Sequence, residues 1–127
     1  NHIEISATPE ETQKRVMTMV TDPARKLRSD PGNPDVCNVY SMHKMFSSRE
    51  EIDMVNVECR RAGIGCVDCK KLLAKNMNHY FEPLREKRAE LSQHPERIWD
   101  ILEDGAGRAR AIAAQTMQEV RAAIGLP

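Results

Sequence analysis

Apolar residues recur every three or four positions along most of this chain, and that spacing limits the fold more than any other feature. The longest such run extends from Val67 to Gln93. Alternating runs of Val, Ile and Thr are nearly absent, and no strand followed by a glycine-rich loop and a helix can be found. The sequence therefore predicts an all-α fold, a helical bundle of about five or six helices preceded by a short extended N-terminal segment.

Capping residues and prolines indicate where the first helices begin. Thr8 stands before Pro9 and two glutamates, and the pair Ser47–Ser48 stands close before another two, so helices are expected to begin at both places. Residues 22–35 carry three prolines and are predicted to form an ordered loop.

Two further breaks are expected in the second half of the chain. Pro83 lies inside the long apolar run and should kink that helix or divide it in two. Gly105 should separate a short helix after Pro95 from a last helix that ends at Gly125. Residues 1–8 are accordingly predicted to be an entry segment and residues 9–127 one helical domain.

Length and charge restrict the function. A chain of 127 residues fits one domain with one modest core, and 19 basic residues balance 19 acidic ones. This balance argues against general attraction to nucleic acid. No stretch has the roughly 20 apolar residues of a membrane span. The chain opens without Met or a signal region, so we expect a piece of a longer cytoplasmic protein.

The four cysteines have the spacing C-x21-C-x6-C-x2-C. No secretory signal precedes them, so a disulfide framework is the weaker interpretation. Two of them follow Gly65 at a predicted helix start, where the helix dipole lowers the pKa of a thiol and favours thiolate ligands. The spacing predicts a tetrahedral metal site with these ligands: Cys37, Cys59, Cys66 and Cys69.

The spacing leaves the metal open. Zinc is the default metal for four thiolates, and a 4Fe–4S cluster takes the same four ligands. His43 and His79 offer a mixed zinc site, but both lie on apolar-striped helices, where an ordinary helical role is more common. Cysteines of the core that bind no metal are the remaining alternative.

Basic residues cluster locally although the net charge is zero. One cluster lies in the proline-rich loop and another flanks the cysteine-rich stretch: Arg25, Lys26 and Arg28, and then Arg60, Arg61, Lys70 and Lys71. Taken singly, each cluster is better explained as a solvated surface.

The sequence resembles the bacterial tryptophanyl-tRNA synthetases, in the part that follows their catalytic domain. The resemblance is carried in order by TDPARKLRSDPGNPDVCNVYSMHKMF (21–46), CRRAGIGCVDCKKLLAKNM (59–77), PLREKRAEL (83–91) and GAGRARAIAAQTMQEVRAAIGL (105–126). NHIEIS resembles the segment just after the family's KMSKS loop. Residues 1–8 are therefore expected to follow that loop, and residues 9–127 to form the helical anticodon-binding domain.

The resemblance implies a class I aminoacyl-tRNA synthetase. In this family a Rossmann catalytic domain activates tryptophan with ATP and Mg²⁺ and transfers it to tRNA(Trp), while the helical domain recognises the anticodon stem-loop. The HIGH and KMSKS motifs and the tryptophan pocket are not found in these residues, so this piece alone is expected to be inactive. The implied partners are the tRNA, the protein's own catalytic domain and, for the whole enzyme, a second copy in a homodimer.

One subgroup of the family carries four cysteines in this domain and binds a 4Fe–4S cluster near the anticodon site. This shifts the expected metal from zinc to iron–sulfur, although the first gap between cysteines is one residue shorter here, around residues 47–51. We expect a structural cluster that fixes the loop so that basic residues face RNA, with an aromatic ring to stack on a base. The expected RNA-contacting residues are Arg25, Lys26, Arg28, Tyr40, Lys44, Arg60, Arg61 and Lys70.

Two other functions fit the same residues. One is a metal-stabilised helical interaction module with no tRNA role. The other is a stand-alone redox protein, which is disfavoured because a lone cluster domain rarely needs so long a helical scaffold.

Overall fold

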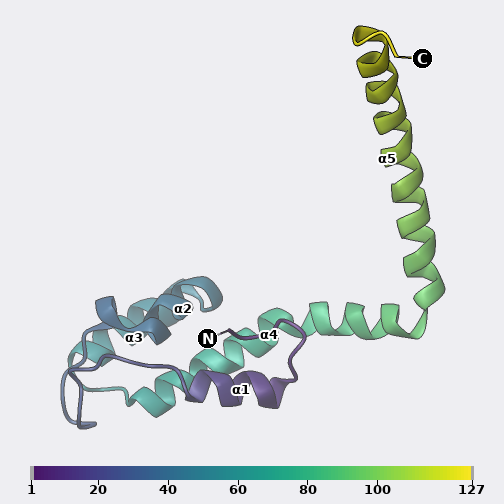
Figure 1. Cartoon of the computed structure of the whole chain (residues 1–127). Helices are drawn as coiled ribbons and strands as arrows, with labels where there is room; N and C mark the ends of the chain where they lie inside the picture. Colours follow the sequence, from purple (N-terminus) through teal and green to yellow (C-terminus); the bar gives the residue numbers. More distant parts are fainter. Residues whose placement is uncertain (1, 127) are drawn as a thin grey trace. The chain divides into compact units, whose positions relative to one another are not determined.

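The structure is a computed structural model that describes residues 2–126, and these residues form helices joined by loops. In chain order the helices are α1 (Pro9–Met17), the 3-10 helix η1 (Pro34–Val36), α2 (Asn38–Phe46), α3 (Arg49–Arg60), α4 (Cys66–Gln93) and α5 (Pro95–Ala123) (Figure 1). No strand occurs in residues 2–126, so the predicted all-α class and number of helices are confirmed. None of the helices described has the length and apolar character needed to cross a membrane.

The predicted helix starts are confirmed by two capping boxes. The Thr8 hydroxyl accepts from the backbone N–H of Glu11, whose carboxylate accepts from the N–H of Thr8 in return. Ser48 and Glu51 form the same reciprocal pair at the start of α3. Each box satisfies two backbone donors that a helix start otherwise leaves unpaired.

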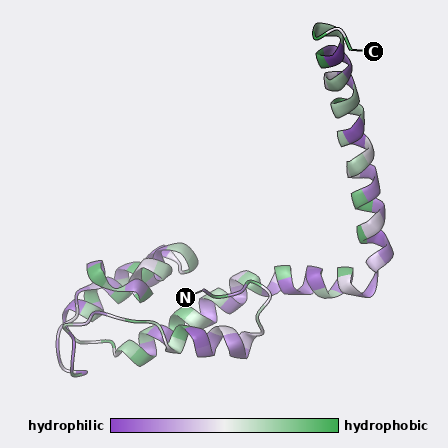
Figure 2. Cartoon of the chain, in the orientation of Figure 1, coloured by the Kyte–Doolittle hydropathy of each residue, from purple (hydrophilic) through white to green (hydrophobic). Residues whose placement is uncertain are grey.

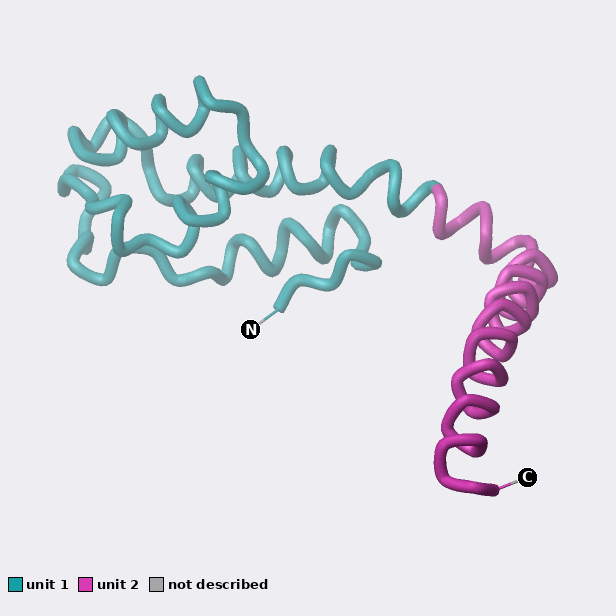
Figure 3. Tube along the Cα trace, turned by 90° about the horizontal axis from the view of Figure 1, so that it is seen from above, with its two compact units in different colours: residues 1–86 teal, residues 87–127 magenta. Residues whose placement is uncertain are grey.

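The chain divides into two compact units, residues 1–86 (unit 1) and residues 87–127 (unit 2), shown in different colours in Figure 3. In Figure 1, α1, α2, α3 and the first part of α4 lie together in unit 1. All four helices contribute to one core, which includes Val16, Val39, Val55, Leu73 and Met77, each at most 1% exposed. A partly buried ring, Phe46, packs edge-on against Phe81 at 5.5 Å between centroids.

Arg85 ties the N-terminal segment to α4 within unit 1. Its Nε donates to the Ala7 carbonyl at 2.7 Å, and its Nη2 donates to the hydroxyl of the fully buried Thr12 at 2.8 Å. The guanidinium also lies 5.8 Å from the centre of the Phe81 ring. Arg85 therefore holds together segments that are more than 70 positions apart in the sequence.

Over residues 87–126, unit 2 has no core of its own. It contains the end of α4 and the whole of α5, and no residue of α5 is buried. Apolar side chains such as Trp99, Ile101 and Ile112 are 64–70% exposed, and apolar and polar residues alternate along α5 in Figure 2. The predicted break at Gly105 is wrong, because α5 runs through this position without interruption. Glycine lowers helix stability by only about 1 kcal/mol relative to alanine, so flanking alanines can carry a helix past it.

Pro83 was expected either to kink the long helix or to divide it in two, and the second expectation is wrong. Pro83 lies inside α4, which is a single helix from Cys66 to Gln93, so Pro83 does not divide it into two helices. The predicted end of the last helix is confirmed, because Gly125 follows α5 with φ of +70°, a conformation that glycine adopts readily.

Candidate metal centre and nucleic-acid interface

The four cysteines come from three different elements of unit 1. Cys37 is the N-cap residue of α2, Cys59 lies in the last turn of α3, and Cys66 and Cys69 lie in the first turn of α4. None of them is in a disulfide; Cys37 and Cys69 are buried and the other two are partly buried. The charges of the other three thiols would each raise the pKa of Cys69, so the four sulfurs lie near one another.

Arg25 points into this cysteine cluster. Its Nη1 lies 3.8 Å from the sulfur of Cys66 and 4.0 Å from that of Cys59. Its Nη2 is held by the carbonyls of Arg28 and Ile64 at 2.8 and 2.9 Å. Among the described residues its buried Nε has no hydrogen-bond partner. An oriented guanidinium with an unmatched donor beside two sulfurs fits a negatively charged group at this place.

The proline-rich loop closes over Cys59. Gly32 donates its N–H to the Cys59 carbonyl at 2.9 Å, and a Cβ at position 32 would lie 2.6 Å from the Cys59 sulfur. Only glycine permits that approach. The buried Asp22 carboxylate holds the loop by accepting from the N–H groups of Asn33 at 2.8 Å and Ala24 at 2.9 Å. These two N–H groups hold the pKa of Asp22 below its usual value.

Two of the four thiols, those of Cys59 and Cys69, are held in their neutral form in this structure. Burial, followed by the neighbouring thiols, raises the pKa of Cys69 to about 12, and burial also raises the pKa of Cys59 against the opposing effect of Arg25. The expectation that the helix start lowers the pKa is therefore wrong for Cys69, because loss of water outweighs the helix dipole there. Metal binding at this site must release protons.

The described residues contain no group of three or more His, Cys, Asp or Glu side chains with the geometry to hold a single metal ion. Four cysteine thiolates are the ligand set of both a structural zinc site and a 4Fe–4S cluster, and the positive charge of Arg25 beside two of the sulfurs fits either group. The predicted ligand set stays a prediction.

Three of the predicted RNA-contacting residues are exposed, two of them in the proline-rich loop and one on α2. Lys26 and Arg28 are exposed, and Arg28 Nη atoms lie 3.4 and 3.5 Å from the carbonyls of Ala62 and Gly63. Lys44 is exposed on α2, with its Nζ 4.9 Å from the centre of the Tyr40 ring.

Other members of the predicted RNA-binding set are engaged within the protein. Tyr40 is only 5% exposed and its hydroxyl accepts from Asn56 at 2.7 Å, so its ring is not open to a stacking base. Lys70 donates to the Met17 carbonyl at 3.0 Å, at the C-terminal end of α1, where a cation is favoured. Arg25 faces the cysteines instead of the solvent.

The two arginines at the end of α3 are exposed but paired. Arg60 binds the carboxylate of Asp35 at 2.7 Å and the side-chain carbonyl of Asn56 at 2.9 Å. Arg61 forms a two-point contact with the Glu58 carboxylate, which raises the pKa of Arg61 further. RNA would have to compete with these carboxylates for both guanidinium groups.

Sequence reasoning named His43 as a possible zinc ligand but favoured an ordinary helical role, and it did not predict that the ring is buried beside Cys69. It is fully buried, and its Nε2 lies 3.4 Å from the sulfur of Cys69. Burial lowers the pKa of the ring, so His43 is neutral at neutral pH. No spacing rule pointed to this contact, because 26 residues separate His43 from Cys69.

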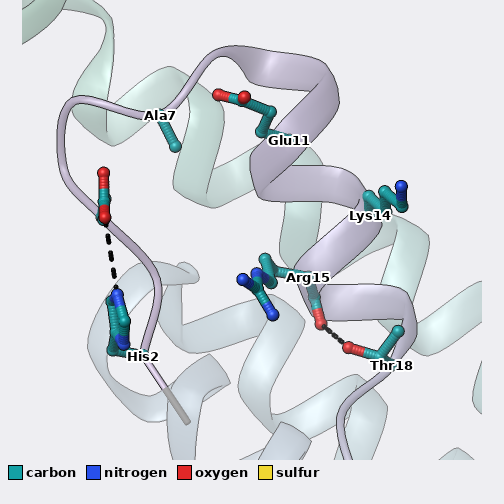
Figure 4. A pocket seen from close by; sticks show the side chains of 7 residues that line it. His2, Ala7, Glu11, Lys14, Arg15 and Thr18 are labelled. Carbon is teal, nitrogen blue, oxygen red and sulfur yellow. Dashed lines mark hydrogen bonds and ion pairs between the residues drawn. The ribbon is translucent and has the colours of Figure 1, made fainter.

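A separate open pocket lies between the N-terminal segment and α1. Figure 4 shows its lining, where His2 pairs with Glu4 at 3.5 Å and the Arg15 carbonyl accepts from the Thr18 hydroxyl at 2.8 Å. None of its lining residues belongs to the cysteine cluster or to the predicted RNA-binding set.

Known proteins similar to this chain are tryptophan–tRNA ligases. The enzyme of Aquifex aeolicus is 41% identical over an alignment of 128 residues, which covers 100% of this chain and 32% of that protein. The enzyme of Thermotoga maritima is 43% identical over 99% of this chain and 39% of its own length. No family model matches the chain.

The fold has a counterpart in a solved structure. The crystal structure of tryptophanyl-tRNA synthetase from Campylobacter jejuni superposes with a TM-score of 0.86 at 31% identity and covers 99% of this chain and 40% of that one. The chain thus spans only about a third to two-fifths of the length of the relatives it matches. Sequence and fold together make this chain homologous, along nearly its whole length, to one part of the bacterial tryptophan–tRNA ligases.

Proposed function

We propose that this chain is the C-terminal, anticodon-binding part of a tryptophan–tRNA ligase. The observation that carries the proposal is collinear similarity to such ligases at 41–43% identity over at least 99% of the chain. In the full-length protein a separate catalytic domain would use ATP and Mg²⁺ to attach tryptophan to tRNA(Trp). The enzyme would act as a cytoplasmic homodimer, and this piece would bind tRNA without catalysing the reaction.

The exposed basic residues of the loop and of α2 support contact with the anticodon stem-loop. Lys26, Arg28 and Lys44 are free of ion pairs within the described residues, so their charges are available to phosphates. Arg60 and Arg61 join them only if RNA displaces Asp35 and Glu58. Phosphate contacts fix the position of a bound RNA, whereas the bases are read at exposed edges.

We further propose that the cysteine cluster holds a 4Fe–4S cluster, with zinc as the alternative. Cys37, Cys59, Cys66 and Cys69 would be the ligands, and Arg25 would lie against the negative charge. The group would have a structural role, because its ligands tie α2, α3 and α4 beneath the proline-rich loop that carries Lys26 and Arg28.

The test is binding of the isolated anticodon stem-loop of tRNA(Trp), measured by gel shift over a range of salt concentrations. We expect binding that weakens with salt, and that weakens further in the double variant Lys26→Ala/Arg28→Ala. Arg110→Ala, which removes an exposed arginine from α5, is the matched control and should change little. Equal affinity for an unrelated stem-loop, or no binding at all, would favour the interaction module that has no tRNA role.

The metal is tested separately on protein purified without oxygen. A broad absorbance shoulder near about 400 nm, with iron and sulfide in equal amounts, would support the iron–sulfur cluster. A colourless protein that contains one zinc ion would support the alternative. Protein in which neither metal binds would refute the metal centre but leave the RNA proposal standing.

A further inference from the structure

A chain of hydrogen bonds leads from the surface of unit 1 to the cysteine cluster. The Asn76 Nδ2 lies 2.6 Å from a carboxylate oxygen of Glu51 and 2.9 Å from the Ser47 hydroxyl. That hydroxyl lies 2.6 Å from Nδ1 of His43. The other ring nitrogen, Nε2, lies 3.2 Å from the carbonyl and 3.4 Å from the sulfur of Cys69.

The direction of each hydrogen bond in this chain follows from its inner end. The Cys69 carbonyl can only accept, so the hydrogen bond at 3.2 Å places a hydrogen on His43 Nε2. In the neutral ring Nδ1 is then unprotonated and accepts the O–H of Ser47. The Ser47 oxygen in turn accepts from the Asn76 amide, whose other N–H donates to the Glu51 carboxylate.

We propose that His43 is a positioning residue of the cysteine cluster, with its Nε2–H held toward the sulfur and carbonyl of Cys69 by Ser47 and Asn76. The inference rests on the proposed metal centre. In this structure one N–H is shared between two weak acceptors of the same residue. When Cys69 becomes a metal-bound thiolate, its sulfur carries negative charge and becomes the stronger acceptor.

This arrangement has two measurable consequences. Hydrogen bonds that orient a metal ligand and balance its charge contribute roughly 10–100-fold to metal affinity. Hydrogen bonds to the sulfurs also help to set the reduction potential of an iron–sulfur cluster. A hydrogen-bond donor stabilises the reduced cluster, which is more negatively charged, more than it stabilises the oxidised cluster. Loss of the donor therefore makes the reduction potential more negative.

The experiment compares four variants with the unmodified chain, each loaded anaerobically with iron and sulfide or with zinc. His43→Leu removes the N–H donor, His43→Gln keeps an N–H near the position of Nε2, and Ser47→Ala removes the group that fixes the ring. His79→Leu is the matched control, because His79 is exposed on α4, with 88% of its side chain accessible. The readouts are the rate of metal loss to a chelator and, for the iron form, the reduction potential.

We expect His43→Leu to lose metal about 10–100-fold faster than the unmodified chain, with a more negative potential. His43→Gln should recover most of both properties, Ser47→Ala should fall between, and His79→Leu should match the unmodified chain. If His43 only fills space, the apolar His43→Leu variant should instead lose metal more slowly than His43→Gln, and its reduction potential should lie closer to that of the unmodified chain.

The outcomes separate this inference from the proposed metal centre. If the unmodified chain takes up neither iron nor zinc, both proposals are wrong. If it loads normally and His43→Leu has unchanged metal loss and potential, only the role of His43 is wrong. Should His43→Leu fail to fold, as judged by circular dichroism, the comparison of His43→Gln and Ser47→Ala with the unmodified chain decides. Equality of all three would refute the inference.

Discussion

The two units are built from similar helices but differ in what holds those helices in place. In unit 1 every helix contributes a fully buried side chain to one core, and the loops are fastened by Asp22, Gly32 and Arg85. In unit 2 a helix of 29 residues has no buried residue at all. Helicity in proteins is usually sustained by packing of an apolar face, so unit 1 is stabilised by tertiary contacts and α5 by local ones.

This difference teaches which substitutions the chain can tolerate. A change at a buried position of unit 1 alters a packed interior or an internal hydrogen bond, whereas a change in α5 alters only helix propensity and exposed surface. The same amino-acid replacement should therefore have very different effects in the two units.

The largest contrast is expected for truncation of one apolar side chain. Leu73→Ala removes a fully buried side chain from unit 1 and should lower the free energy of unfolding by about 2–5 kcal/mol. Ile112→Ala in α5, where the side chain is 70% exposed, should change it by no more than about 0.5 kcal/mol. Urea unfolding followed by circular dichroism measures both, and equal effects would show that the two units are not different in kind.

A smaller contrast is expected for two arginines of α4. Arg85→Met removes the donors to Ala7 and to the buried Thr12 hydroxyl and should destabilise the chain by about 1.5–3 kcal/mol. Arg88→Met, three residues later, removes an exposed side chain and serves as the control. If the two variants melt at the same temperature, Arg85 does not fasten the N-terminal segment.

In α5 we expect a stabilising substitution. A Cβ at Gly107 would meet nothing within 4 Å, so Gly107→Ala should stabilise the helix by about 0.5–1 kcal/mol through propensity alone. Gly32→Ala in unit 1 is the opposite case, since its Cβ would collide with the Cys59 sulfur. Thermal unfolding followed by circular dichroism measures the expected gain in stability of Gly107→Ala and the expected loss in Gly32→Ala. A loss of stability in Gly107→Ala would contradict local control of α5.

The smallest effect is confined to acid. The pKa of Asp22 in the folded chain lies below its unfolded value, so its contribution to stability is complete above about pH 4 and is lost as pH falls through the folded pKa. Asp22→Asn should flatten the dependence of unfolding on pH in that range. Asp53→Asn removes an exposed carboxylate and controls for the change in net charge. An unaltered pH profile in Asp22→Asn would show that the loop does not depend on this carboxylate.

Local rules predicted much of unit 1. The starts of α1 and α3 followed from Thr8 and Ser48, because capping depends only on residues a turn apart. The metal site that the spacing of the four cysteines predicts stays a prediction. The predicted break at Gly105 was wrong, because the helix-propensity penalty of one glycine is small compared with the favourable propensity of the other residues of α5.

The directions of long side chains could not be predicted in the same way. Arg25 was expected at an RNA surface and instead meets Cys59 and Cys66, and Tyr40 was expected to be open and is buried. The direction of Arg25 depends on contacts with segments that are 30 or more positions away in the sequence. The burial of Tyr40 depends on how α2 packs against α3. Sequence spacing carries no information about such contacts.

The contact between Arg85 and Ala7 has a consequence for how the protein is made. The residues that fasten the N-terminal segment come from the last turn of unit 1, 78 positions after it. While the chain is being synthesised, α1 can form early, but its docking has to wait until Arg85 has left the ribosome. Within unit 1, the residues that are translated earliest are therefore among the last to reach their native place.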